Sequence, residues 1–156
     1  MYLSSGEGSD SFLERLNSVL NPIRKPEMFV TMAFLAWDGS RLAFSTAGHP
    51  PILQYCREGR STKELACSNL PVGLFSPREF GGDFVSPRKG ELFLLCTDGL
   101  LEVTNKAGAE FGITGMEAFL GSVDHQPLNA VADGILEATR AFGRNDDDES
   151  LLLIRC

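Results

Sequence analysis

A continuous run of five apolar residues, Leu92–Cys96, constrains the fold more than any other stretch of this chain. A glycine precedes the run at position 90 and an Asp-Gly pair follows it, a pattern that predicts a strand buried on both faces. Thr97 ends the strand, so the carboxylate of Asp98 lies at the C-terminal end of the strand, where a cation or a reacting group can reach it. Asp-Gly pairs also mark ordinary turns, so the spacing alone leaves a turn and a functional site as alternatives.

Length and composition are those of a globular domain. With 156 residues, 43% of them hydrophobic, the chain can bury a substantial core, and we predict one domain over residues 10–156 after a frayed N-terminus at 1–9. The net charge of −7 argues against a nucleic-acid surface and against binding to an anionic membrane. Four widely spaced cysteines favour reduced thiols over disulfides or zinc. Without a signal-peptide layout or a run of transmembrane length, the prediction is a cytoplasmic protein.

Hydrophobic periodicity predicts a mixed helical and β chain. The expected strands are 28–37, 41–45, 52–55, a short one within 57–68, 84–85, 92–96 and 151–154. The expected helices are 10–20, a short helix or turn at 100–103, one that opens at 114, and 127–142. Asp38-Gly39 is typical of a hairpin turn, and Leu70–Phe75 is interpreted as a buried turn. Thr114 and Glu117 match a capping box, and Gly121 is expected to close that helix.

Four consecutive acidic residues, Asp146–Glu149, stand shortly before the second apolar run, Leu151–Ile154. Acidic runs are usually solvated, but this one is internal and lies where a buried strand is predicted to begin. If the two apolar strands are antiparallel neighbours, Asp98 and the acidic run share one edge of the sheet. Repulsion between close carboxylates is relieved by a divalent cation or by protonation. Ligands that are all oxygen favour Mg²⁺ or Mn²⁺ over zinc.

Six short motifs occur in a fixed order along the chain. They are Phe29-Val30-Thr31, Ala47-Gly48-His49-Pro50-Pro51, Leu70-Pro71-Val72-Gly73-Leu74, Thr97-Asp98-Gly99-Leu100, Glu110-Phe111-Gly112 and Asp147-Asp148-Glu149-Ser150-Leu151. Together they resemble the SpoIIE/RsbU-like serine phosphatases, a branch of the metal-dependent PP2C phosphatases. The resemblance implies an α+β fold, in which helices flank an αββα sandwich of antiparallel sheets that here lacks its N-terminal strands.

The resemblance also implies the site. Asp98 and Asp147 match metal ligands of a site with two Mn²⁺ or Mg²⁺ ions, whose bridging water attacks a phosphoserine or phosphothreonine. Residues expected close to the metals or the phosphate are His49, Thr97, Gly99, Asp148 and Ser150. For His49 a solvated loop histidine is an equal alternative, because histidine suits both roles.

The family's early Gly-Asp and Asp-x-x-Gly motifs have no counterpart in this sequence. We therefore expect the C-terminal part of a phosphatase domain, from a longer protein or a short relative, with weak or no activity alone. The expected partner is a phosphoprotein, for example an anti-sigma-factor antagonist, and open sheet edges favour a homodimer. The alternatives are a non-catalytic, degenerate module that binds proteins and, less well supported, an aspartyl-phosphate transferase with Asp98 as nucleophile.

Overall fold

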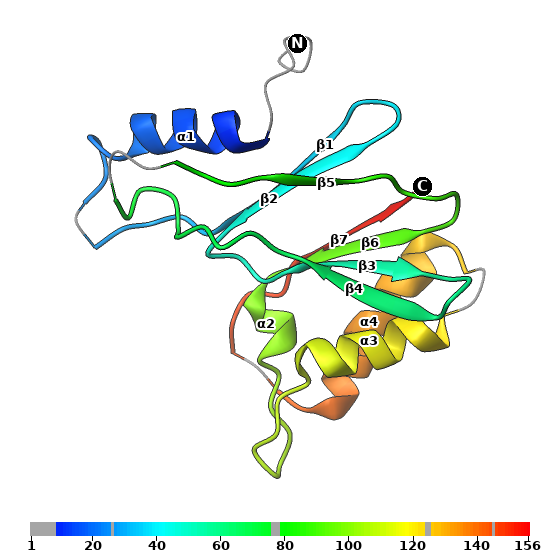
Figure 1. The fold of residues 1–156 in the computed structure, drawn as a ribbon. Coiled ribbons are helices and arrows are strands. Elements are labelled where there is room, and N and C mark those ends of the chain that lie inside the picture. Colours follow the sequence, from blue (N-terminus) through cyan, green and yellow to red (C-terminus); the bar gives the residue numbers. More distant parts are fainter. Residues whose placement is uncertain (1–8, 26, 76–78, 124–125, 145) are drawn as a thin grey trace. The chain divides into compact units, whose positions relative to one another are not determined.

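The computed structural model describes residues 9–25, 27–75, 79–123, 126–144 and 146–156. The chain forms two compact units, one made of Met1–Pro51 with Leu65–Pro87 and the other of Ile52–Glu64 with Arg88–Cys156. The described residues contain two antiparallel sheets and four helices (Figure 1), which confirms the predicted α+β class. A single domain over residues 10–156 and the frayed N-terminus stay predictions, and residues 1–8 lie outside the described part.

The first unit contains a three-stranded sheet and one helix. Its elements are α1 (Ser9–Leu20), β1 (Met32–Trp37), β2 (Leu42–Ala47) and β5 (Asp83–Val85), with the strand order β1-β2-β5. Asp38 Oδ1 accepts hydrogen bonds from the backbone amides of Ser40 at 2.9 Å and Arg41 at 2.7 Å. Gly39 adopts φ +100°, which favours glycine. The predicted Asp-Gly hairpin between β1 and β2 is therefore confirmed.

Helix α1 holds the segment around Val72 in place. Its buried Asn17 donates to the Phe75 carbonyl at 3.0 Å and accepts from the Gly73 amide at 2.7 Å. Val72 is fully buried, but Leu70 and Phe75 are 38% and 53% exposed, so the interpretation of 70–75 as a buried turn is wrong at both ends. Backbone bonds between Val72 and Val30 form only an isolated bridge, and β1 therefore begins at Met32, four residues later than predicted.

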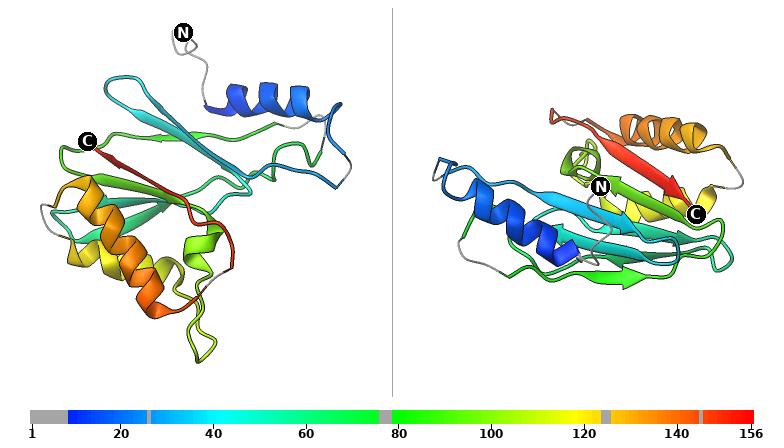
Figure 2. Two further views of the ribbon diagram at one scale, coloured as in Figure 1. Left: turned by 180° about the vertical axis from the view of Figure 1, so that it is seen from behind. Right: turned by 90° about the horizontal axis from the view of Figure 1, so that it is seen from above.

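The second unit contains a four-stranded sheet and three helices. Its strands are β3 (Ile52–Cys56), β4 (Ser61–Leu65), β6 (Leu92–Cys96) and β7 (Leu151–Arg155), in the order β4-β3-β6-β7. Its helices are α2 (Asp98–Leu101), α3 (Gly112–Ser122) and α4 (Leu128–Phe142). Helices α3 and α4 lie on one face of this sheet (Figure 2). The core between them is made of Leu53, Tyr55, Leu92, Leu94, Cys96, Leu100, Met116, Leu120, Val131 and Ile135.

Burial confirms β6 as the central strand but corrects the prediction for β7. Four of the five β6 residues are buried, whereas Leu152 of β7 is 54% exposed. The difference follows from position, because β7 is the last strand in the order β4-β3-β6-β7. An edge strand covered by helices on one face leaves alternate side chains in solvent.

Three of the predicted helix boundaries are wrong. Helix α3 begins at Gly112 and has Phe111 at its N-cap without a side-chain cap bond, so Thr114 lies inside the helix and forms no capping box. The Phe111 ring, directly before the start of the helix, packs edge-on against Phe142 of α4, with centroids 5.4 Å apart. The helix continues through Gly121 to Ser122, and α2 begins at Asp98 instead of Leu100.

Candidate functional site

The end of β6 and the start of β7 lie side by side, which confirms the pairing supposed for the two apolar runs. The two strands are antiparallel neighbours, and Cys96 of β6 pairs with Leu151 of β7 (Figure 1). The residues that follow Cys96 therefore lie next to the residues that precede Leu151. These are the two segments whose motifs carry Asp98 and Asp147.

Thr97 ties the two segments together. Its backbone amide donates to the Ser150 carbonyl at 3.0 Å, and its hydroxyl accepts a bond from the Ser150 amide at 3.0 Å. The same hydroxyl donates to the Asp148 carbonyl at 3.1 Å. The sequence placed Thr97, Asp148 and Ser150 near the site, but it gave no signal that Thr97 bonds to the backbone of the other two.

Asp98 is the first residue of α2 and is exposed to solvent. Its Oδ1 accepts a hydrogen bond from the amide of Gly99 at 3.1 Å, which restricts the rotation of the carboxylate. Gly99 itself is buried. Burial, and secondarily the negative charge of Asp98, raise the pKa of the Cys96 thiol to about 11. Cys96 is thus a neutral core residue at physiological pH, while Asp98 carries an accessible charge beside it.

Asp147 has the same local geometry on the opposite segment. It is exposed, and its Oδ1 accepts a hydrogen bond from the Asp148 amide at 2.8 Å. Further along the acidic run, Glu149 Oε2 lies 4.0 Å from the Arg140 guanidinium of α4, a contact at the outer limit of an ion pair. The acidic run is therefore anchored by the backbone at Asp148 and at the following Ser150, and residues 146–148 are exposed.

His49 belongs to the first unit, whereas the two aspartates belong to the second. It follows Gly48, which adopts φ +64°, and its Nδ1 lies 2.9 Å from the Pro50 carbonyl. This contact is local to its own loop. A role for His49 at the site stays a prediction.

The two aspartates are ligands of the type that a hard divalent cation prefers, but two residues are too few to complete its coordination. Asp98 and Asp147 offer carboxylate oxygens, which Mg²⁺ and Mn²⁺ prefer. In the described part of the chain, no group of three or more His, Cys, Asp or Glu side chains is arranged to hold a metal ion. Mg²⁺ takes six oxygen ligands, so these two carboxylates fit part of a metal site, and their roles as ligands stay predictions.

Comparisons with known proteins agree with this architecture. The sequence matches the family of Stage II sporulation protein E (SpoIIE) over residues 2–156. The PP2C domain of SpoIIE from Bacillus subtilis, solved with a regulatory-domain fragment, is 20% identical, with a TM-score of 0.81 over 99% of this chain and 46% of that one. The SiaA PP2C domain of Pseudomonas aeruginosa is also 20% identical, with a TM-score of 0.78 over 94% of this chain and 60% of that one.

A third similar structure contains the RsbU and RsbW domains of a Mycobacterium tuberculosis protein. It is 23% identical, with a TM-score of 0.76 over 98% of this chain and 44% of that one. A search of curated proteins finds no match. The chain thus spans between 44% and 60% of the length of these three structures. No helix among the described residues is long and apolar enough to cross a membrane.

The fold is that of a PP2C phosphatase domain, a class of serine/threonine phosphatases. Within this class, the chain belongs to the SpoIIE family. The predicted relationship to SpoIIE and RsbU phosphatases is confirmed.

Proposed function

We propose that this chain forms the C-terminal part of the catalytic domain of a metal-dependent protein serine/threonine phosphatase, with Asp98 and Asp147 as ligands of Mn²⁺ or Mg²⁺. The observation that supports the proposal most is the pairing of Cys96 with Leu151, which brings the two motif segments to one end of the sheet. Membership of the SpoIIE family supports the reaction class, since PP2C phosphatases are metal-dependent.

The chain's own residues have distinct roles in this proposal. Divalent ions at such a site activate a water molecule and offset negative charge on the phosphoryl oxygens. Asp98 and Asp147 supply carboxylate oxygens, and each is oriented by a bond from the following backbone amide. Thr97 is a positioning residue, because its hydroxyl bonds to the backbone at Asp148 and Ser150 and fixes the acidic run against the end of β6.

The proposed substrate is a protein that carries phosphoserine or phosphothreonine. Both aspartates are exposed, and an open surface of this kind accommodates a protein segment. The family resemblance suggests an anti-sigma-factor antagonist as one substrate of this class. Because the two carboxylates are only part of a metal site, we expect the isolated chain to release phosphate slowly or not at all.

Phosphate release from a phosphopeptide in the presence of Mn²⁺ tests the proposal. The assay compares this chain with a longer form that includes the early Gly-Asp and Asp-x-x-Gly motifs. In the active form, Asp98→Ala and Asp147→Ala should each lower kcat by at least about a hundredfold. Asp133→Ala, which removes an exposed carboxylate from α4, is the matched control and should have no effect. Full activity after both site substitutions would refute the assignment.

We also propose that β7 pairs with a strand of a second copy of this chain. Within the described residues, β7 lies at one end of the strand order, and an unpaired edge offers backbone donors and acceptors. Light scattering after size exclusion should show a dimer that dissociates on dilution. Leu152→Lys, at the exposed position of β7, should shift the equilibrium to monomer. A monomer at every concentration rules the pairing out.

A further inference from the structure

The segment that follows Asp98 and the segment that precedes Asp147 are joined at a second place, apart from the strand ends. The Thr104 amide donates to the Arg144 carbonyl at 3.1 Å, and the Arg144 amide donates to the Thr104 carbonyl at 3.2 Å. Thr104 comes six residues after Asp98, and Arg144 comes three residues before Asp147. We call this reciprocal pair of backbone bonds the distal clamp.

The acidic run is thus held on both of its sides. Thr97 fixes Ser150, which follows the run, and the distal clamp fixes Arg144, which precedes it. Three residues of chain span at most about 11 Å, so an anchor at Arg144 limits the region that Asp147 can reach. The placement of the Asp147 carboxylate therefore depends on the distal clamp as well as on Thr97.

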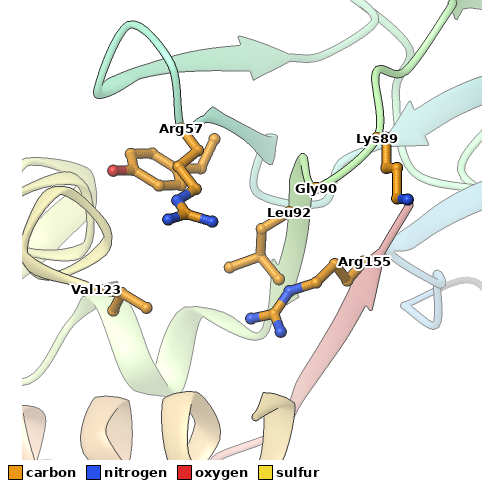
Figure 3. A pocket seen from close by; sticks show the side chains of 7 residues that line it. Arg57, Lys89, Gly90, Leu92, Val123 and Arg155 are labelled. Carbon is orange, nitrogen blue, oxygen red and sulfur yellow. The ribbon is translucent and has the colours of Figure 1, made fainter. Parts of the chain in front are cut away.

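Strand β7 itself is fixed as far as its other end. Tyr55 of β3, Leu92 of β6 and Arg155 of β7 form a row across the sheet there, and Figure 3 shows Leu92 and Arg155 close together. Beyond that row, the Cys156 amide donates to the Glu91 carbonyl at 3.1 Å. Because β7 is paired along its whole length, the position of the acidic run depends on the anchors that precede the strand.

One side of the distal clamp belongs to a hairpin that starts at Thr104 and ends at Glu110, the two residues that form its basal bridge (Figure 1). Asn105 Oδ1 accepts hydrogen bonds from the amides of Ala107 at 2.9 Å and Ala109 at 3.1 Å. The Asn105 amide also donates to the Ala109 carbonyl at 2.9 Å. The Asn105 side chain thus joins the two sides of the turn and shapes the hairpin directly after the clamp residue.

The other side of the distal clamp belongs to the end of α4. Gly143, the C-cap residue of this helix, lies so close to the Thr104 carbonyl that a Cβ atom would overlap it. The preceding Phe142 packs edge-on against Phe111, which directly follows the hairpin. The Thr104 backbone is therefore held between the hairpin and the end of α4, and a change in either element is transmitted to Arg144.

We propose that Asn105 is a positioning residue of the metal site, which acts through the distal clamp on the placement of Asp147. The inference rests on the proposed function, since it takes Asp147 as a metal ligand. When a ligand is correctly placed in only a fraction of the molecules, the apparent affinity for the ion falls by that fraction. Loss of the Asn105 side chain lowers this fraction, although no metal ligand is removed.

Calorimetric titration of the chain with Mn²⁺ tests the proposal. Asn105→Ala should weaken Mn²⁺ binding by about threefold to tenfold, because the two hydrogen bonds that shape the hairpin are lost. Asn105→Asp keeps the acceptor oxygen and should restore binding. The matched control Asn129→Ala removes an exposed side-chain amide from α4 and should change nothing.

Hydrogen exchange of the Thr104 and Arg144 amides, measured without metal, tests the distal clamp by itself. Both amides should exchange about tenfold faster in Asn105→Ala, while the amides within β6 keep their wild-type rates. Unchanged exchange at Thr104 and Arg144 overturns the proposal, and so does faster exchange with unchanged Mn²⁺ affinity. Absence of Mn²⁺ binding by the wild-type chain overturns the assignment of Asp147 as a ligand, and the positioning role with it.

Discussion

The Thr97 amide donates to the Ser150 carbonyl at 3.0 Å, and the Ser150 amide donates back to the Thr97 hydroxyl at the same distance. This reciprocal pair extends the ladder between β6 and β7 by one residue beyond Cys96 and Leu151. The Thr97 hydroxyl thus accepts the hydrogen bond that a backbone carbonyl would accept in a regular ladder. This bond fixes the position of the acidic run where it leads into β7. The relative placement of the Asp98 and Asp147 segments depends on this pair.

Removing the Thr97 hydroxyl should loosen the acidic run. Thr97→Val keeps the branched shape but deprives the Ser150 amide and the Asp148 carbonyl of their partner. We expect a loss of about 0.5–1.5 kcal/mol in the free energy of unfolding, measured by urea denaturation, because water replaces part of the lost bonding. Mn²⁺ affinity should fall as well. Thr97→Ser, which keeps the hydroxyl, should restore both, and wild-type values for the valine variant would count against the role of Thr97.

Gly143, at the end of α4, should tolerate no side chain. A Cβ atom at this position would overlap the backbone carbonyl of Thr104, in the segment that forms a bridge with Arg144. Because the obstacle is backbone, Gly143→Ala should destabilise the protein by about 1–3 kcal/mol. Thermal and urea unfolding measure the change.

Gly121 provides the matched control for that substitution. It lies within α3, and a Cβ atom there meets nothing within 4 Å. Gly121→Ala should therefore stabilise the protein by about 0.5–1 kcal/mol through its helix propensity. If both alanine variants changed stability in the same direction, the packing described around Gly143 would be wrong.

The Asp38 turn should make stability depend on acid pH. Hydrogen bonds from the backbone of Arg41, and then of Ser40, lower the pKa of Asp38 from 3.8 to about 2. Because the folded-state pKa is depressed, the contribution is fully present above pH 4 and is lost as pH falls toward 2. Asp38→Asn should thus be less stable than wild type at pH 6. The difference in stability between the two proteins should be smaller at pH 2. Thermal unfolding between pH 2 and 6 tests this, and a constant difference would contradict it.

Local patterns predicted the elements that depend on local chemistry. The apolar run Leu92–Cys96 and the Asp38-Gly39 turn are where the sequence placed them. The antiparallel pairing of β6 and β7 was supposed for the two apolar runs, and it implied that Asp98 and the acidic run share one edge of the sheet. The register confirms the pairing.

Features that depend on contacts distant in sequence were not predictable. Helix α3 starts at Gly112, next to Phe111, whose ring packs on Phe142 of α4, and the capping pattern at Thr114 was misleading. The exposure of Leu152 follows from the edge position of β7, and no sequence periodicity reveals which strand is at an edge. The row of Tyr55, Leu92 and Arg155 requires the register of three strands.

The convergence of Asp98 and Asp147 on one cation is tested most directly by Mn²⁺ titration of the isolated chain, followed by paramagnetic broadening of backbone amide signals. The account predicts that one ion broadens the amides of Thr97–Leu100 and of Asp146–Ser150 together. Asp98→Asn and Asp147→Asn should each abolish the broadening in both segments, and Asp133→Asn in neither. Broadening of one segment without the other, or its persistence in both site variants, would contradict the account.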